Sequence, residues 1–416
     1  MNLIFRAAKI VDAKSQFHNQ IVDVIVEDGK IKEIGSSLPN ANGYKELKFD
    51  NLHLSQGWFD TSVCFGEPGF EDCETIENGL RTAAKSGFSG VALQPNTFPI
   101  IDNQSQVRFV KTKAQDAATE LYPIGALTKD SLGKDIAEMY DMAKAGAIAF
   151  GDYNKSISNA NLLKIALQYV QDFGGLVIAY SEDENIKGNG VVNEGLVSTQ
   201  LGLKGIPSLA EELQLSRNLD ILEYTGGKLH IPTISTDKSV DLIRQAKAKG
   251  LQVTCSVAVH HLVLTDDALH EFDTCYKVAP PLRSESVRKS LIAGVLDGSI
   301  DVITTDHHPV DIEHKKIEFG LARNGTIGLE SAFGALLTIL PLDVVIEKLT
   351  NGRSVFNVQE HLIEVGNAAN LCLFNPAENW VFGKENILSK SKNSAFLGTA
   401  MQGKVYGSYN QGKLVL

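Results

Sequence analysis

Short β-branched segments recur through the middle of the chain, and each is followed by a stretch whose apolar residues have helical spacing. After the first segment, for example, Glu77, Leu80 and Ala84 recur at helical intervals. The eight segments lie near residues 57–63, 90–96, 121–127, 146–152, 175–181, 228–234, 251–257 and 301–307. Eight alternating β and α units predict an α/β fold built on a (β/α)8 TIM barrel, in which functional groups gather at the C-terminal ends of the strands.

The two ends of the chain have a different pattern, in which apolar and polar residues alternate with period two. Near the N-terminus this pattern lies on both sides of Asp28-Gly29, which is typical of a β-hairpin turn. Near the C-terminus it lies on both sides of residues 410–412. Because β-segments at opposite ends of a chain often pair, we predict a composite β-sandwich domain from residues 1–55 and 360–416. The barrel domain would then occupy residues 56–359.

Composition and charge exclude several classes of protein. The formal net charge of −11 and the scattered lysines and arginines disfavour binding to nucleic acid or to an anionic membrane. No apolar run approaches the roughly 20 residues that span a bilayer, and the first residues lack the apolar core of an export signal. The 5 cysteines are widely spaced without a CxxC pair, which fits reduced thiols. We therefore expect a cytoplasmic protein with no nucleic-acid or membrane partner.

Several short motifs follow the predicted strands or lie near the C-terminus. They are EPG (67–69), PNT (95–97), NEG (193–195), HHLVLTDDAL (260–269), PPLRSE (280–285), TDHHP (305–309), GLE (328–330) and SKSKN (389–393). With these motifs the chain resembles the dihydroorotases of multifunctional pyrimidine-synthesis complexes, within the cyclic amidohydrolase superfamily, over nearly its whole length. The resemblance implies a barrel of the amidohydrolase type. It also implies metal-assisted interconversion of dihydroorotate and carbamoyl aspartate, with a carboxylate that shuttles the proton.

The resemblance implies six metal-site positions, of which only two keep the residue type of the family. Histidines are expected at four of them, where this chain has hydroxyls or a thiol, and the two aspartates are retained, with Asp306 at the catalytic position. The six positions are Ser62, Cys64, Asp152, Tyr180, Thr233 and Asp306. Since hydroxyl groups are poor ligands for zinc, we expect these positions to be vestigial and to hold no metal, unless zinc binds a rebuilt site.

The residues that contact substrate in the family are mostly replaced as well. The resemblance places an arginine, an asparagine and a histidine where this chain has Gly66, Ala279 and Val310, while Asn96 survives. An arginine binds a carboxylate through two charge-assisted hydrogen bonds, and glycine supplies neither. The sequence therefore predicts a pseudoenzyme.

Three functions remain open at this stage. The leading one is a homo-oligomeric, non-catalytic homologue that acts as a structural or regulatory partner, for example of aspartate transcarbamoylase. The second is an active dihydroorotase, or another cyclic amide hydrolase, whose metal site is rebuilt from Cys64, Asp152 and Asp306, with or without a nearby histidine (His307 or His308). The third is a small-molecule binding protein; its polar but uncharged lining would favour a neutral ligand and would consist of Asn96, Ser62, Tyr180 and Thr233.

Two further expectations concern buried titratable groups. Without a cation beside them, Asp152 and Asp306 need neighbouring hydrogen-bond donors or a raised pKa. His260 and His261 follow the seventh predicted strand, and adjacent residues of a strand point to opposite sides. We therefore expect at most one of these two histidines to face the barrel mouth.

Overall fold

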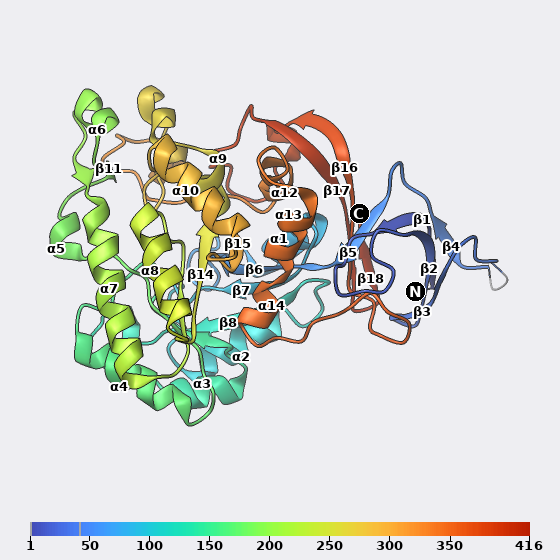
Figure 1. Ribbon diagram of the computed structural model, residues 1–416, viewed down its shortest axis with the longest axis horizontal. Coiled ribbons are helices and arrows are strands. Elements are labelled where there is room, and N and C mark those ends of the chain that lie inside the picture. The colour runs from blue at the N-terminus through green and yellow to red at the C-terminus, as the bar shows by residue number, and fades with distance from the viewer. Residues whose placement is uncertain (1, 41–42) are drawn as a thin grey trace.

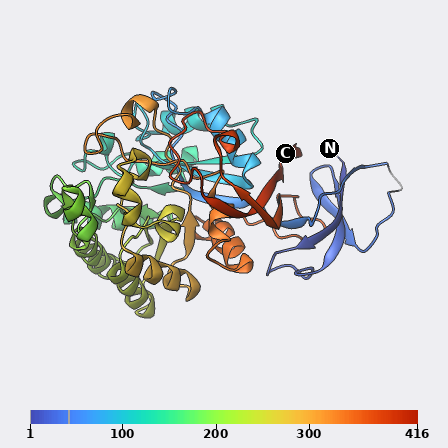
Figure 2. The same ribbon diagram turned by 90° about the horizontal axis from the view of Figure 1, so that it is seen from above.

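The computed structural model describes residues 2–40 and 43–416. A parallel barrel occupies one end of the molecule and a largely antiparallel sheet occupies the other, with both chain termini on the side of the sheet (Figure 1). Seen from above, the sheet projects from one end of the barrel (Figure 2). Within the described part of the chain, no helix is long and apolar enough to cross a lipid bilayer.

Eight parallel strands form the barrel, and each overlaps a segment predicted from the sequence. They are β6 (Trp58–Val63), β7 (Phe88–Leu93), β8 (Glu120–Gly125), β9 (Ala149–Phe150), β10 (Val177–Ile178), β13 (Leu229–Ile231), β14 (Val253–Ala258) and β15 (Val302–Thr304). A parallel bridge between Val63 and His307 closes the barrel between β6 and β15. The strands are buried on both faces, which explains their nearly continuous apolar sequences.

One main helix follows each strand and covers the outside of the barrel. These helices are α1 (Ile76–Lys85), α2 (Gln104–Lys113), α3 (Met139–Ala145), α4 (Ala160–Gln171), α7 (Ser208–Thr225), α8 (Asp237–Ala248), α10 (Glu285–Leu296) and α13 (Leu342–Thr350). Helix α1 begins where the side chain of Thr75 accepts a hydrogen bond from the N–H of Asn78. The eightfold alternation read from the sequence is therefore confirmed.

Shorter elements decorate the loops at the C-terminal ends of the strands. They are α5 (Glu184–Lys187), β11 (Val192–Asn193), α6 (Leu196–Leu201), β12 (Gly205–Ile206), α9 (Val259–Val263), α11 (Ile312–Lys315) and α12 (Ala332–Leu336), whereas α14 (Gly352–Val355) follows α13 and lies at the N-terminal ends of the strands. His260 and His261 lie in α9 and not on a strand, so both are buried and their rings are 4.4 Å apart. The premise that they lie on a strand is wrong, while the expectation that at most one of them faces the barrel mouth agrees with their absence from the lining of the cavities there.

The terminal segments pair into one hydrogen-bonded sheet, as their alternation predicts. It contains β1 (Leu3–Ile10), β2 (Ile21–Glu27), β3 (Lys30–Gly35), β4 (Lys45–Leu47), β5 (His53–Gln56), β16 (Leu371–Val381), β17 (Ala400–Asn410) and β18 (Lys413–Val415). In the predicted hairpin turn, Asp28 and Gly29 have φ of 49° and 80°, the left-handed conformation that two-residue hairpin loops need. The same conformation recurs at Gln411 and Gly412.

The sheet and the barrel share a hydrophobic core. The ring of Trp58, at the start of β6, lies 4.9 Å from that of Phe333 and 6.1 Å from that of Phe374 on β16. Because a barrel strand and a sheet strand bury the same aromatic cluster, the sheet packs against the barrel at the N-terminal end of β6. The division at residues 55/56 and 359/360 stays a prediction.

Candidate functional site at the barrel mouth

Ser62 and Asp306 meet because the first and last strands of the barrel are neighbours. The hydroxyl of Ser62 donates a hydrogen bond to Oδ1 of Asp306 at 2.9 Å. The amide of Gln94, which follows β7, donates to Oγ of Ser62 at 3.1 Å. The structure thus brings together two of the six predicted metal-site positions, and it joins them by a hydrogen bond.

A second buried carboxylate lies beside this pair. Asp60, on β6, accepts hydrogen bonds from the N–H of Ser62 at 3.1 Å, from Oγ1 of Thr304 at 2.5 Å, and from the N–H and hydroxyl of Thr305. Burial raises the pKa of Asp60 to about 6. Burial, with the charge of Asp60 as a smaller cause, raises the pKa of Asp306 to about 7. Both carboxyl groups therefore have pKa values near neutral pH, in a site where their hydrogen-bond donors are hydroxyl and backbone groups.

Asp152 is held separately, by the loop that follows β8. Its Oδ1 accepts from the N–H groups of Leu127 at 2.9 Å and of Thr128 at 3.0 Å, and its Oδ2 accepts from the hydroxyl of Thr128. Burial still raises the pKa of Asp152. The expectation that the retained carboxylates have neighbouring donors or a raised pKa is confirmed for both Asp152 and Asp306.

The remaining three positions hold neutral groups. Cys64 is 4% exposed, and burial raises the pKa of its thiol to about 12. The hydroxyls of Tyr180 and Thr233 are buried and make no hydrogen bond with any described residue. Thr233 and Asp306 each have a φ of 46°. This left-handed conformation is rare for the β-branched Thr233, where it costs about 1–3 kcal/mol, and is commoner for an aspartate.

These six groups do not fit a zinc centre. Three of the six are hydroxyl groups, which are poor zinc ligands, and the other three, Cys64, Asp152 and Asp306, do not bring their ligand atoms within 4.8 Å of one another in the described residues. Among residues 2–40 and 43–416, one group of three ligand atoms from His, Cys, Asp or Glu lies within 4.8 Å of one another. That group is Asp72, Cys73 and Asp311, on the loops that follow β6 and β15, and it contains none of the six positions.

The four predicted substrate-contact positions lie together at the mouth. Asn96, Gly66 and Val310 line a cavity of about 160 Å³, and Asn96 and Ala279 line an adjoining cavity of about 450 Å³. Gly66 has a φ of 76°, and a Cβ atom there would lie 2.5 Å from the carbonyl oxygen of Phe70. The backbone at this position therefore accommodates glycine and excludes a side chain as large as arginine.

Of the other residues at the mouth, His308 belongs to the TDHHP motif (305–309), whereas Tyr153, Lys155 and Arg323 carry no sequence signal that would single them out. Tyr153, next to Asp152, places its hydroxyl 3.1 Å from Nδ1 of His308. Burial lowers the pKa of His308 to about 4, so this imidazole is neutral at pH 7. Lys155 and Arg323 line the larger cavity from loops whose sequences have no periodicity.

Comparison with known proteins agrees with this architecture. A family profile described as "Dihydro-orotase-like" matches residues 53–239. A protein named "Dihydroorotase" from Pelotomaculum thermopropionicum is 40% identical over 423 residues, covering 100% of this chain and 99% of that one. A second, from Acetivibrio thermocellus, is 38% identical with the same coverage.

Solved structures show the same fold at lower sequence identity. An L-hydantoinase (dihydropyrimidinase) from Arthrobacter aurescens superimposes with a TM-score of 0.86 at 21% identity, covering 100% of this chain and 97% of that one. A D-hydantoinase from a Thermus species gives a TM-score of 0.83 at 20% identity, with 99% and 94% coverage. The barrel and terminal sheet of this chain therefore have the same fold as these two hydantoinases. The sequence identity of this chain to the two dihydroorotases, which extends over its full length, shows that the chain belongs to the dihydroorotase family.

Proposed function

We propose that this chain is a non-catalytic dihydroorotase homologue that serves pyrimidine biosynthesis as a structural or regulatory partner. The observation that carries the proposal is the hydrogen bonding of the two retained carboxylates. Ser62 donates to Asp306, and the loop after β8 donates three hydrogen bonds to Asp152. Carboxylates that would otherwise bind a cation are thus used as acceptors within the fold.

The substrate side of the mouth supports the same proposal. An arginine at position 66 would need a different backbone conformation, because of the positive φ and the close approach of the carbonyl group of Phe70. Loss of an arginine fork removes both the charge and the orientation that it gives to a substrate carboxylate. Replacing Gly66 with arginine alone would therefore not restore the missing contact to a substrate carboxylate.

We propose a homo-oligomer, with aspartate transcarbamoylase as the first partner to test. The outer faces of α4 and α7, which pack against each other, expose large apolar side chains at intervals of four residues. They are Ile165 and Tyr169 on α4, and Leu209 and Leu213 on α7, each 40–50% exposed. Exposed apolar side chains of this kind are common at subunit contacts. Co-purification with transcarbamoylase from the same organism supports this partner; a homo-oligomer that excludes the enzyme at micromolar concentrations contradicts it.

Zinc content and turnover test the loss of catalysis. We expect no zinc-dependent interconversion of dihydroorotate and carbamoyl aspartate in protein purified without chelator and then offered excess zinc. Because Asp72, Cys73 and Asp311 could hold an ion elsewhere, zinc is counted per chain in the wild type and in a Cys73→Ser, Asp311→Asn variant.

Zinc that disappears in this control variant leaves the proposal intact. Zinc that persists in the control, together with turnover that is lost in both Asp152→Ala and Asp306→Ala, would overturn it in favour of an active cyclic amide hydrolase with a rebuilt site.

A further inference from the structure

A thiol, an imidazole and two carboxylates lie together on two loops, apart from the six positions at the strand ends. Asp72 and Cys73 belong to the loop that follows β6, while Asp311 and His314 lie where α11 begins, after β15. One ligand atom each of Asp72, Cys73 and Asp311 lies within 4.8 Å of the other two. Thiolate, imidazole and carboxylate are the ligand types that zinc prefers, so this cluster has the chemistry of a zinc site.

Two of these groups lie against the same atom, Oδ2 of Asp311. Sγ of Cys73 lies 3.7 Å from it, and Nδ1 of His314 lies 2.5 Å from it. Zinc bonds to sulfur and oxygen of about 2.3 and 2.1 Å, at the tetrahedral angle, separate the two ligand atoms by about 3.6 Å. The thiol and this carboxylate are therefore already spaced as they would be around one tetrahedral ion.

The carboxylate of Asp311 is held in this orientation by the start of α11. Its Oδ1 accepts hydrogen bonds from the N–H groups of Glu313 at 2.9 Å and of His314 at 3.1 Å, which leaves Oδ2 facing Cys73 and the ring of His314. A hydrogen bond from an imidazole to a ligating carboxylate is a common way to orient a metal ligand.

No cation other than His314 offsets the charge of this cluster. Within the described part of the chain, neither Asp72 nor Asp311 forms an ion pair with a lysine or an arginine, and the one ion pair of Asp311 is with His314. Cys73 is 8% exposed, so a thiolate there would be largely removed from water and would need a cation beside it. A divalent ion meets this need.

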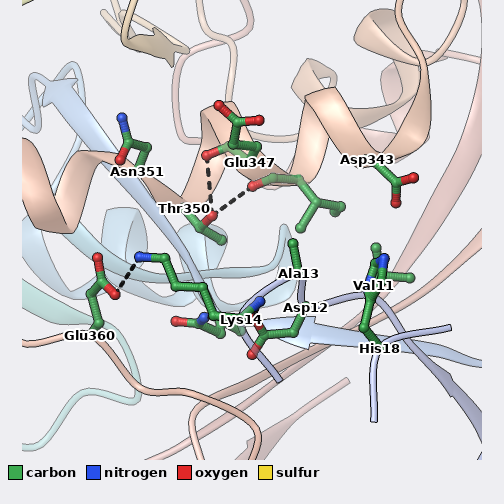
Figure 3. Close-up of a pocket in the computed structure, with 12 residues that line it drawn as sticks. Val11, Asp12, Ala13, Lys14, His18, Asp343, Glu347, Thr350, Asn351 and Glu360 are labelled. Atoms are coloured by element: carbon green, nitrogen blue, oxygen red, sulfur yellow. Dashed lines mark hydrogen bonds and ion pairs between the residues drawn. The ribbon is translucent and has the colours of Figure 1, made fainter. Parts of the chain in front are cut away.

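The cavity between the terminal sheet and α13 provides a contrast (Figure 3). It is lined by the acids Asp12, Asp343, Glu347 and Glu360, and no cysteine is among its lining residues. Lys14 pairs with Glu360 at 2.6 Å, as the dashed line in Figure 3 shows, and Lys348 pairs with Glu347 at 3.2 Å. Lysines thus offset acids there, whereas the cluster around Cys73 combines a thiol with acids that no lysine pairs with in the described residues.

We propose that Asp72, Cys73 and Asp311 bind one zinc ion, which ties the loop after β6 to the loop after β15. His314 acts as a positioning residue through its hydrogen bond to Asp311. On binding, the S–H bond of Cys73 breaks, its proton passes to solvent and a Zn–S bond forms. The ion is structural: it holds together two loops that line the smaller mouth cavity, through Cys73 and Val310. The proposal does not depend on whether the chain is catalytic.

Cobalt(II) is the probe that tests this inference, because a cobalt–thiolate bond absorbs in the near ultraviolet and a tetrahedral cobalt ion absorbs strongly in the visible. We expect protein freed of metal with a chelator, and then separated from the chelator, to bind one cobalt ion per chain with both absorptions. Zinc should displace the cobalt and remove both absorptions, since such sites bind zinc more tightly. The melting temperature should rise with zinc, because the ion binds only the folded chain.

Four variants make the test specific. Cys73→Ser should abolish the near-ultraviolet absorption, and Asp311→Asn, which keeps an acceptor at the start of α11, should weaken cobalt binding by about tenfold or more. His314→Gln should weaken binding by about tenfold and keep the thiolate absorption, as a positioning role requires. Cys275→Ser removes another loop thiol, beside Asp273, and should leave the spectrum unchanged. Circular dichroism in the presence of a chelator checks that each variant is folded.

The outcomes separate this inference from the proposed function. Absence of the near-ultraviolet absorption in the wild type, its survival in Cys73→Ser or its loss in Cys275→Ser overturns the inference alone. Absorption that is lost in Cys64→Ser and kept in Cys73→Ser would place the ion at the strand ends. That result overturns the inference as well, and only zinc-dependent turnover would then decide against the proposed function.

Discussion

Replacing Asp306 with asparagine should stabilise the folded chain above neutral pH. Burial raises the pKa of Asp306 to about 7, whereas an unfolded aspartate has a pKa of 3.8. The folded chain therefore binds the proton more tightly, so its stability falls as pH rises between these two values. At about 1.4 kcal/mol per pH unit, the ionised carboxylate lowers stability by about 4 kcal/mol at pH 8. Asparagine does not titrate, and its Oδ1 can still accept from Ser62.

The asparagine amide brings two buried donors, and leaving them unpaired costs about 1 kcal/mol. We therefore expect a net gain of about 3 kcal/mol in the free energy of unfolding near pH 8, decreasing to a small loss near pH 4. Urea denaturation of the wild type and the variant at several pH values measures this difference. Asp241→Asn, whose side chain is 62% exposed, controls for net charge and should change stability by less than about 0.5 kcal/mol.

A companion variant checks the cause of the effect. Ser62→Ala removes the donor to Oδ1 of Asp306, so the pKa of Asp306 should rise further and stability near pH 8 should fall. An Asp306→Asn variant that is destabilised throughout, or whose effect does not change with pH, would show that Asp306 is already ionised and stabilised in the fold. That result would refute the electrostatic reasoning and would suggest a cation beside this carboxylate.

Two other substitutions test the packing and polar contacts of the barrel. Thr128→Val keeps the shape but removes a hydroxyl donor to Asp152, and we expect a loss of about 1–3 kcal/mol at pH 7 in urea denaturation. Gly87→Ala places a Cβ 2.8 Å from the ring of Trp58 at a φ of 92°, and strain plus overpacking should cost about 2–4 kcal/mol. Calorimetry should show the lower melting temperature, whereas Gly250→Ala, at φ 83° in open space, should cost only about 1 kcal/mol.

The barrel could be predicted from the sequence because its periodicity is local. Strands buried on both faces appear as short apolar runs, and even a strand as short as Ala149–Phe150 lies inside a predicted segment. The inserted elements between β10 and α7 were not predictable in the same way. β11 and β12 have only two residues each, too few for an alternation to be recognised, and they pair only because the fold brings residues 192–193 and 205–206 together.

Of the candidate site, the sequence could predict only the residues that lie at the ends of the barrel strands. Ser62 and Asp306 meet as barrel closure requires, while His260 and His261 depart from the expected alternation because a short helix begins at Val259. Arg323 lies 17 positions beyond Asp306 along the chain, in a loop whose path depends on tertiary contacts and not on local propensity. The sequence pattern therefore could not predict the charge of the cavity lining.

Three buried carboxylates at or near the mouth, those of Asp60, Asp152 and Asp306, are compensated by hydroxyl groups. Ser62 donates to Asp306, Thr128 to Asp152, and the hydroxyls of Thr304 and Thr305 to Asp60. In an active site of this type, cations would offset the same buried charge, since an uncompensated buried carboxylate is strongly unfavourable.

The hydroxyl of Ser62 is a poor metal ligand, and it also donates the hydrogen bond that Asp306 needs when no cation is beside it. Restoring a histidine at Ser62 alone would remove the donor to Asp306 while three other ligand positions stayed neutral. If the chain is non-catalytic as proposed, the loss is self-reinforcing at this position: the Ser62 hydroxyl stabilises Asp306, and a return to catalysis would require several simultaneous substitutions together with a changed backbone at Gly66.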